Sequence, residues 1–147
     1  MYGLLLLLHV LAATIWTGGH IVMSVAILPR AIKERSPEQL LRFESVYEKI
    51  GMPALVVQII TGFILAYRLL PDFNQWLNFS NPITQVLATK IILLVLTFGL
   101  AINARFRILP NLSNDNIVLM AWHIAAVTVI SILFVVAGVS FRTGWLY

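Results

Sequence analysis

Four long apolar runs limit the fold of this chain more than any other feature of its sequence. They cover residues 3–28, 53–70, 82–104 and 117–141. At about 1.5 Å per residue, a helix of such length crosses a hydrocarbon core of about 30 Å. The runs are continuous rather than alternating, which excludes a closed β-barrel. The sequence therefore predicts an all-α integral membrane four-helix bundle, organised as a single domain over residues 1–147.

The composition supports a membrane solvent and excludes several classes of function. Of the 147 residues, 60% are hydrophobic and 11% are charged, more apolar surface than a soluble domain of this size can bury. The chain has no cysteine, which excludes disulfides, iron–sulfur clusters and thiolate metal sites. The net charge of +4 comes without a basic tail, so no nucleic-acid partner is expected.

The N-terminus resembles the apolar part of a signal peptide between Leu4 and Leu8. No basic residue precedes this stretch, and the apolar run continues to Leu28 without a clear cleavage site. The pattern predicts a retained transmembrane helix.

An amphipathic segment, residues 36–50, separates the first two spans. Ser36 suits a helix N-cap, Pro37 suits the first helical position, and Gln39 completes a capping box. Gly51 and Pro53 follow, and both residue types interrupt helices. We therefore expect a short amphipathic surface helix that is separate from the second span.

The distribution of basic residues predicts the orientation in the membrane. The first connection carries Arg30, Lys33, Arg35, Arg42 and Lys49, and the third carries Arg105 and Arg107. We expect an inner-membrane protein with these two connections in the cytoplasm and both termini outside, on the periplasmic side. An outer aromatic belt is predicted from Tyr2, Trp76, Trp145 and Tyr147.

Four ionisable residues within the spans are the best candidates for function: His9, His20, Lys90 and His123. His9 and His20 are eleven residues apart, so they share one stripe of a helix at about 16 Å separation. The alternating direction of the spans places Lys90 at the level of His9 and His123 at the level of His20. We therefore expect an outer His9/Lys90 level and an inner His20/His123 level.

Imidazoles on facing helices are typical of b-type haem sites in helical bundles. The sequence favours His20 and His123 as axial ligands of one haem, and His9, with Lys90, as ligands of a second. Arg68 and Arg142, at the outer ends of spans two and four, are candidates for the haem propionates. The alternatives are interfacial snorkelling of Lys90 and both arginines, and histidines that merely hydrogen-bond between helices.

Copper is an alternative at the inner level. Met23 and Met120 each lie three residues from a histidine, so His20, Met23, Met120 and His123 offer two imidazoles and two thioethers to Cu(I). Met52 is a candidate for a further sulfur, although methionine in apolar helices more often packs than binds. Hydrolysis is not supported, since the spans contain no acid and the chain contains no nucleophile motif. No convincing internal repeat is visible.

The first span resembles a known family. The stretch from Leu8 to Gly19, LHVLAATIWTGG, followed by Leu28-Pro29-Arg30, resembles the opening helix of CopD-like copper-resistance membrane proteins and of HemJ-type protoporphyrinogen oxidases. Lys90, near the start of the third span, resembles a lysine of both groups. The resemblance implies a four-helix membrane fold. It also implies haem binding and activity at His9 and Lys90, as in the HemJ-type group, or copper handling.

The leading hypothesis is thus a membrane protein that binds one or two b-type haems and moves electrons within the bilayer. A quinone or another small redox partner would fit, and a homo-oligomer is compatible with the sequence. The alternatives are a copper-handling or copper-transport protein, a protoporphyrinogen oxidase-like enzyme, and a cofactor-free scaffold.

Overall fold

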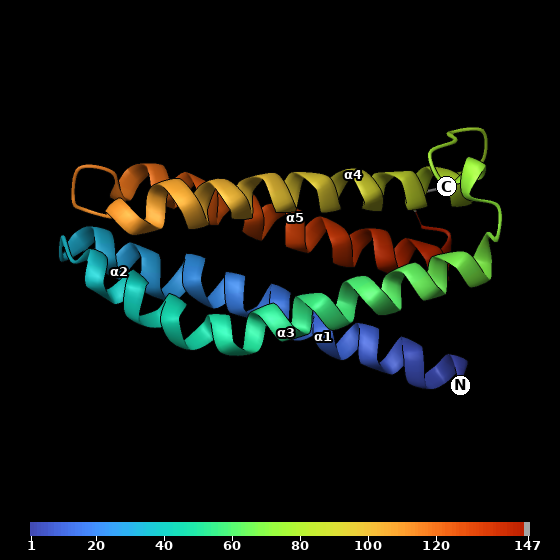
Figure 1. Cartoon of the computed structure of the whole chain (residues 1–147), viewed down its shortest axis with the longest axis horizontal. Helices are drawn as coiled ribbons and strands as arrows, with labels where there is room; N and C mark the ends of the chain where they lie inside the picture. The colour runs from blue at the N-terminus through green and yellow to red at the C-terminus, as the bar shows by residue number, and fades with distance from the viewer. Residues whose placement is uncertain (146–147) are drawn as a thin grey trace.

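The computed structural model describes residues 1–145, and these residues form helices joined by short connections (Figure 1). Four helical stretches are long and apolar enough to cross a membrane, and no strand occurs between Met1 and Trp145. This confirms the predicted all-α membrane bundle. Tyr147 of the predicted aromatic belt lies outside the described residues.

The helix bounds follow the apolar runs, with added turns at several ends. The helices are α1 (Tyr2–Val22), α2 (Leu28–Lys33), α3 (Pro37–Leu69), α4 (Pro82–Asn103) and α5 (Ile117–Thr143). A π-helix, Met23–Ile27, joins α1 to α2, so these elements form one continuous stretch. A second π-helix, Ala104–Ile108, extends α4.

The helices pack as two layers. α1 packs along α3, α4 packs along α5, and α1 also contacts α5. Both termini and the α3–α4 connection lie at one end of the bundle, and the other two connections lie at the opposite end (Figure 1). We call these the terminal end and the basic end, because the basic end carries the residues of the first and third connections, among them Arg30, Lys33, Arg35, Arg105 and Arg107.

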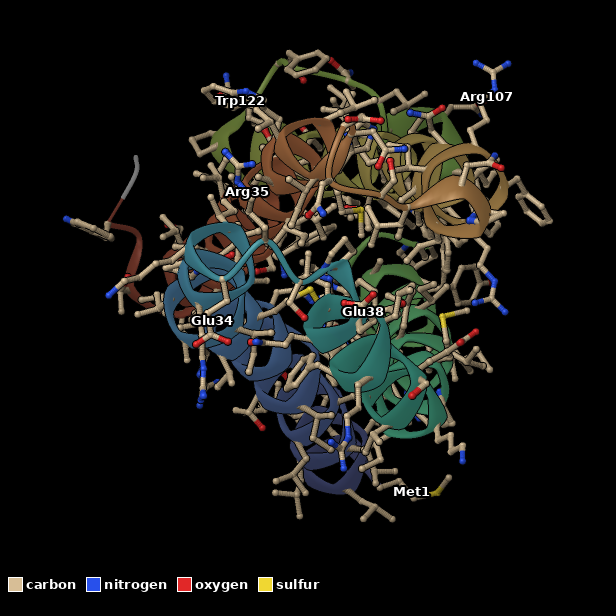
Figure 2. The ribbon with its side chains drawn as sticks, turned by 90° about the vertical axis from the view of Figure 1, so that its left-hand side faces the viewer. Met1, Glu34, Arg35, Glu38, Arg107 and Trp122 are labelled. Carbon is tan, nitrogen blue, oxygen red and sulfur yellow. The ribbon has the colours of Figure 1, made fainter. Side chains whose placement is uncertain are left out.

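Apolar side chains cover the outside of the bundle, as lipid contact requires. Val25, Val95 and Trp122 are between 66% and 72% exposed, and Trp122 stands at the periphery in the view onto the basic end (Figure 2). Such exposure over four helices would be unfavourable in water. The chain is therefore a multi-pass membrane protein in contact with the bilayer.

The predicted break between the surface helix and the second span is wrong. Residues 37–50 are helical, but α3 continues through Gly51 and Pro53 to Leu69. A proline inside a membrane helix is tolerated where neighbouring groups compensate for its missing N–H. Gly51 serves packing rather than termination, because the ring of Tyr47 lies against it.

The predicted capping box at Ser36 is also wrong. The Ser36 hydroxyl donates to the Glu38 carboxylate at 3.0 Å, and the Gln39 side chain donates to Glu34 instead of reaching back to the helix start. A capping box does form at the start of α4, where Asn81 and Thr84 bond reciprocally.

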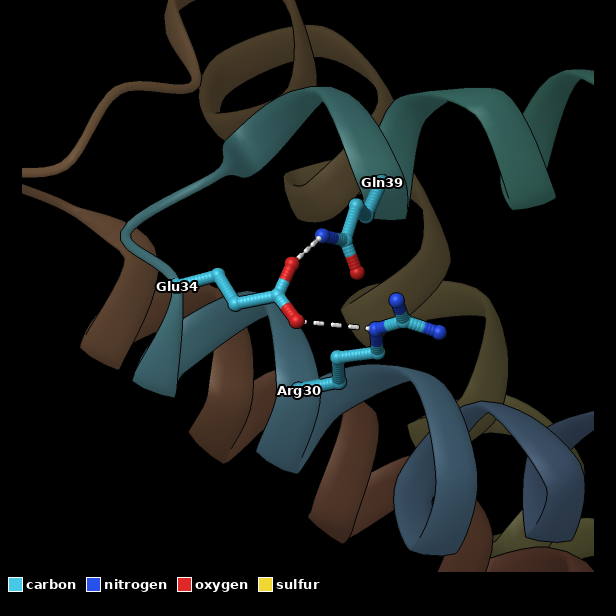
Figure 3. A network of polar contacts seen from close by, with 3 residues as sticks. All are labelled: Arg30, Glu34 and Gln39. Atoms are coloured by element: carbon cyan, nitrogen blue, oxygen red, sulfur yellow. Dashed lines mark hydrogen bonds and ion pairs between the residues drawn. The ribbon is translucent and has the colours of Figure 1, made fainter.

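A polar network closes the turn between α2 and α3 at the basic end (Figure 3). Arg30 Nε donates to Glu34 Oε1 at 2.9 Å, and Gln39 donates to the other carboxylate oxygen. These hydrogen bonds hold the pKa of the Glu34 carboxyl below its ordinary value. In the view onto this end, Glu34, Arg35 and Glu38 lie around the turn, and Arg107 lies at the far edge of the bundle (Figure 2).

Candidate functional site

His9 is held by two oxygen atoms of α3. Its Nδ1 lies 3.0 Å from the Gln58 carbonyl oxygen and 3.0 Å from Thr61 Oγ1. The Thr61 hydroxyl donates its own hydrogen to the Val57 carbonyl at 2.6 Å, so both oxygens accept from His9. Nδ1 therefore carries a hydrogen, and Nε2, which has no hydrogen-bond partner within residues 1–145, presents its lone pair.

Lys90 faces the same region from α4. Its Nζ lies 5.2 Å from the centre of the Phe141 ring and next to Gly138, both in α5. Within the described chain Nζ has no ion-pair or hydrogen-bond partner. His9 and Lys90 thus both lie in the first half of helices that start at the terminal end, and their shared level stays a prediction.

An unpartnered polar atom lies beside this level. The Gln58 side-chain oxygen is buried and has no hydrogen-bond partner in the part of the chain that the structure describes. Burying such a group without a partner costs about 1–3 kcal/mol. A donor supplied by a bound ligand would remove this cost.

The His20 side chain is buried between its own helix, α1, and α3. Its Nδ1 donates to the Trp16 carbonyl at 2.9 Å, and the Tyr47 hydroxyl donates to the same oxygen at 2.9 Å. The imidazole packs against the Trp16 indole with ring centres 4.4 Å apart and the ring planes tilted by 51°. As in His9, Nε2 keeps its lone pair and has no hydrogen-bond partner among the described residues.

His123 differs from the other two histidines. Its Nδ1 donates to the Leu119 carbonyl at 3.0 Å, and its Nε2 accepts from the Asn103 amide at 2.7 Å. The atom through which His123 would bind a metal is therefore engaged by α4. The His20 ring has its partners in α1 and α3, and no hydrogen bond joins it to His123 across residues 1–145.

The methionines divide into buried and exposed ones. Met23 and Met120 are 3% and 5% exposed and belong to one cluster of buried side chains at the basic end. Met52 is 49% exposed on α3. In residues 1–145 no group of three or more His, Cys, Asp or Glu side chains forms a metal site.

Arg68 and Arg142 both lie exposed at the terminal end, where no ion pair engages either one within the described range. Arg68 lines an open groove of about 430 Å³ together with Phe63, Tyr67 and Trp76. Arg142 follows Phe141, whose ring packs under the Lys90 ammonium.

Four residues outside the predicted site set shape these sites: Tyr47, Gln58, Thr61 and Asn103. Gln58 and Thr61 stand out as polar residues inside a span, so their polarity was an available signal. Asn103 is the last residue of α4 and Tyr47 lies inside α3, and only packing shows their contacts with His123 and α1.

Comparison with known proteins places the fold in a family. Residues 41–141 match the model of the family described as copper resistance protein D. The chain belongs to the copper resistance protein D family. No curated protein and no solved structure matches the chain.

The copper resistance protein D match supports the predicted resemblance to copper-resistance membrane proteins. It covers most of α3, all of α4 and most of α5, and thus includes Lys90, Met120 and His123. Helix α1, with His9 and His20, lies before the matched range. The helix packs against the matched part of the chain, at α3 and α5.

Proposed function

We propose that this protein binds b-type haem in the terminal-end half of the bundle and moves electrons within the membrane. The observation that carries this proposal is the state of His9. Two acceptors on α3 fix the hydrogen on Nδ1 and leave the Nε2 lone pair unpaired. Metal-binding histidines are typically held in this way by a second partner.

Small residues and cations in the terminal-end half support an apolar cofactor with anionic groups. Gly62 lies against the His9 ring and Gly138 against Lys90, so neither α3 nor α5 crowds the region with a side chain at those points. Lys90 offers either a second nitrogen ligand or a cation for a propionate. Arg68 and Arg142 are further candidate partners for propionates at the membrane surface.

The chain's own residues would then have distinct roles. His9 would hold the iron, Gln58 and Thr61 would fix the orientation of its ring, and the neighbouring helices would exclude water. Haem iron, when bound, supplies a one-electron couple. His20, on the same stripe of α1 about 16 Å away, would hold a second haem at a separation suited to transfer across the bilayer.

Copper is the second candidate, at the basic-end half. His20 has an unpaired Nε2, Met23 lies three residues after it, and Met23 and Met120 are buried in one cluster. Thioether and imidazole ligands suit Cu(I). His123 would join them only after its hydrogen bond with Asn103 breaks. Membership of a family named for copper resistance favours this candidate.

The cellular setting follows from the same proposal. The clustering of basic residues at one end favours an inner-membrane location with that end in the cytoplasm and both termini outside. A quinone or another small redox molecule would exchange electrons with the site, entering from the lipid that surrounds the helices.

Absorption spectroscopy of the purified protein, oxidised and then reduced with dithionite, tests the haem proposal. We expect a Soret band, sharp reduced α and β bands, and a pyridine haemochrome content of one or two haems per chain. His9→Ala should remove one haem, and His123→Ala should leave that haem in place.

A colourless protein from haem-sufficient cells would overturn the haem proposal. Copper content by mass spectrometry, and Cu(I) titration against a colorimetric chelator, would then decide the second candidate. Failure of both would leave a cofactor-free bundle.

A further inference from the structure

The two π-helices occupy the same position in two halves of the chain. Each covers five residues, ends in isoleucine and is followed by Leu-Pro. Met23–Ile27 precedes Leu28-Pro29, and Ala104–Ile108 precedes Leu109-Pro110. π-Helices are rare, and they commonly mark functional segments. The two π-helices therefore lie at matching positions, within one residue, counted from the starts of α1 and α4.

The same offset relates the two ionisable residues of the terminal-end half. Ile27 and Ile108 are separated by 81 positions (108 − 27), and so are His9 and Lys90 (90 − 9). At this offset residues 1–30 align with residues 82–111 without a gap. Helix α1 begins at Tyr2 and α4 at Pro82, within one residue of the offset. Identical pairs are Leu6/Leu87, Gly18/Gly99, Ile21/Ile102, Ile27/Ile108, Leu28/Leu109 and Pro29/Pro110.

The second helix of each half repeats as well. Gly62 in α3 lies against the ring of His9, and Gly138 in α5 lies against the ammonium of Lys90. The two glycines are 76 positions apart (138 − 62), as are Tyr47 and His123 (123 − 47). Tyr47 and His123 each hydrogen-bond to the preceding long helix of their own half, at Trp16 and Asn103 respectively.

The packing agrees with this correspondence. α1 pairs with α3 as α4 pairs with α5, and α1 and α4 both start at the terminal end (Figure 1). Parallel repeats of this kind are related by a pseudo-two-fold axis along the membrane normal, and ligand sites of such proteins lie where the repeats meet.

We propose that the chain consists of two copies of one helical hairpin, and that His9 and Lys90 occupy one equivalent position on opposite sides of a single site between the copies. The identification of the shared ligand as haem rests on the proposed function, whereas the repeat does not. Gly62 and Gly138 then occupy equivalent positions beside the functional side chain of their own half, and the contact at Gly62 is the tighter of the two.

An exchange of the two side chains follows from this geometry. An imidazole introduced at position 90 would sit against Gly138, in the environment that Gly62 gives His9. The backbone carbonyl of Phe134 corresponds to that of Gln58 (134 − 58 = 76) and would accept from the ring. Ala137 replaces Thr61, so the second acceptor of His9 would be missing, and A137T would restore it.

The test compares the wild-type protein with H9K, K90H, and the double variant H9K/K90H, with and without A137T. Haem per chain and the Tm of haem-free protein are measured for each. H9K places two ammonium groups at the site and K90H places two imidazoles there, while the double variant restores one of each. We expect both single variants to lose most of the haem and the double variant to regain at least half of the wild-type content, more with A137T.

The Tm of the haem-free protein keeps the two proposals distinguishable. H9K should lower the Tm through like-charge repulsion, and adding K90H should restore it. If the wild type holds haem but the double variant is as poor in haem as the single ones, the shared site is overturned. If the wild type holds no haem, the proposed function fails, and recovery of the Tm in the double variant decides for or against the repeat.

Discussion

The ring of Tyr47 in α3 packs against the backbone of Gly19 in α1 so closely that no Cβ atom fits between them. This contact brings the Tyr47 hydroxyl to the Trp16 carbonyl, the same oxygen that orients His20. G19A should push the ring away and break that hydrogen bond, with a loss of about 1–3 kcal/mol from overpacking. Thermal unfolding in detergent measures this loss as a lower Tm.

The neighbouring glycine supplies the control for this prediction. No atom lies within 4 Å of a Cβ at Gly18, and alanine favours a helix over glycine by about 1 kcal/mol. G18A should therefore keep or raise the Tm. Equal losses in G18A and G19A would contradict the close approach of α1 and α3.

A substitution at Gly62 should disturb the His9 site more than the corresponding substitution at Gly138. A Cβ at Gly62 would lie 3.1 Å from His9 Cε1, whereas a Cβ at Gly138 would lie 3.6 Å from Lys90 Nζ, an ordinary contact. G62A should tilt the imidazole, shift the Soret band and lower the haem content, while G138A leaves both near wild type. Haem content and spectrum of the two variants measure this, and identical behaviour would argue against seating by Gly62.

The methionines offer a test of copper binding that spares the fold. Met23→Leu nearly conserves volume, so stability should change by less than about 1.5 kcal/mol. If Cu(I) binds at His20, Met23 and Met120, the affinity should fall about tenfold or more, because a thioether ligand is lost. Met52→Leu, at an exposed position, should leave the affinity unchanged. Competition against a Cu(I) chelator measures both, and equal effects of the two variants would remove Met23 from the ligand set.

Glu34 should make the stability pH-dependent in acid. Its pKa is lowered in the folded state by the hydrogen bonds from Arg30 and Gln39. The resulting stabilisation is present above the ordinary pKa of about 4.5 and is lost as the pH falls through the lowered folded value. E34Q should remove this component from a profile of Tm between pH 7 and pH 3, and R30A should reduce it. A wild-type profile in E34Q would show that the network is not formed in solution.

The four crossings could be predicted from the sequence because each apolar run alone is long enough to span the bilayer, whatever its neighbours. The break at Gly51 and Pro53 could not be judged in this way. A membrane interior tolerates proline inside a helix, and the role of Gly51 depends on where the ring of Tyr47 lies.

The candidate site shows the same division. His9, His20, Lys90 and His123 stand out in the sequence because ionisable groups are costly in hydrocarbon, and helical spacing sorts them into levels. Hydrogen-bond partners come from other helices, so only the tertiary structure shows that Nε2 is unpaired in His9 and His20 and engaged by Asn103 in His123. The proposed equivalence of His9 and Lys90 likewise rests on a sequence repeat too weak to stand out without the two π-helices. The length and hydropathy of each apolar run are local properties that the sequence determines. Which ring nitrogen of each histidine stays free to bind a ligand is decided by the helix packed against it.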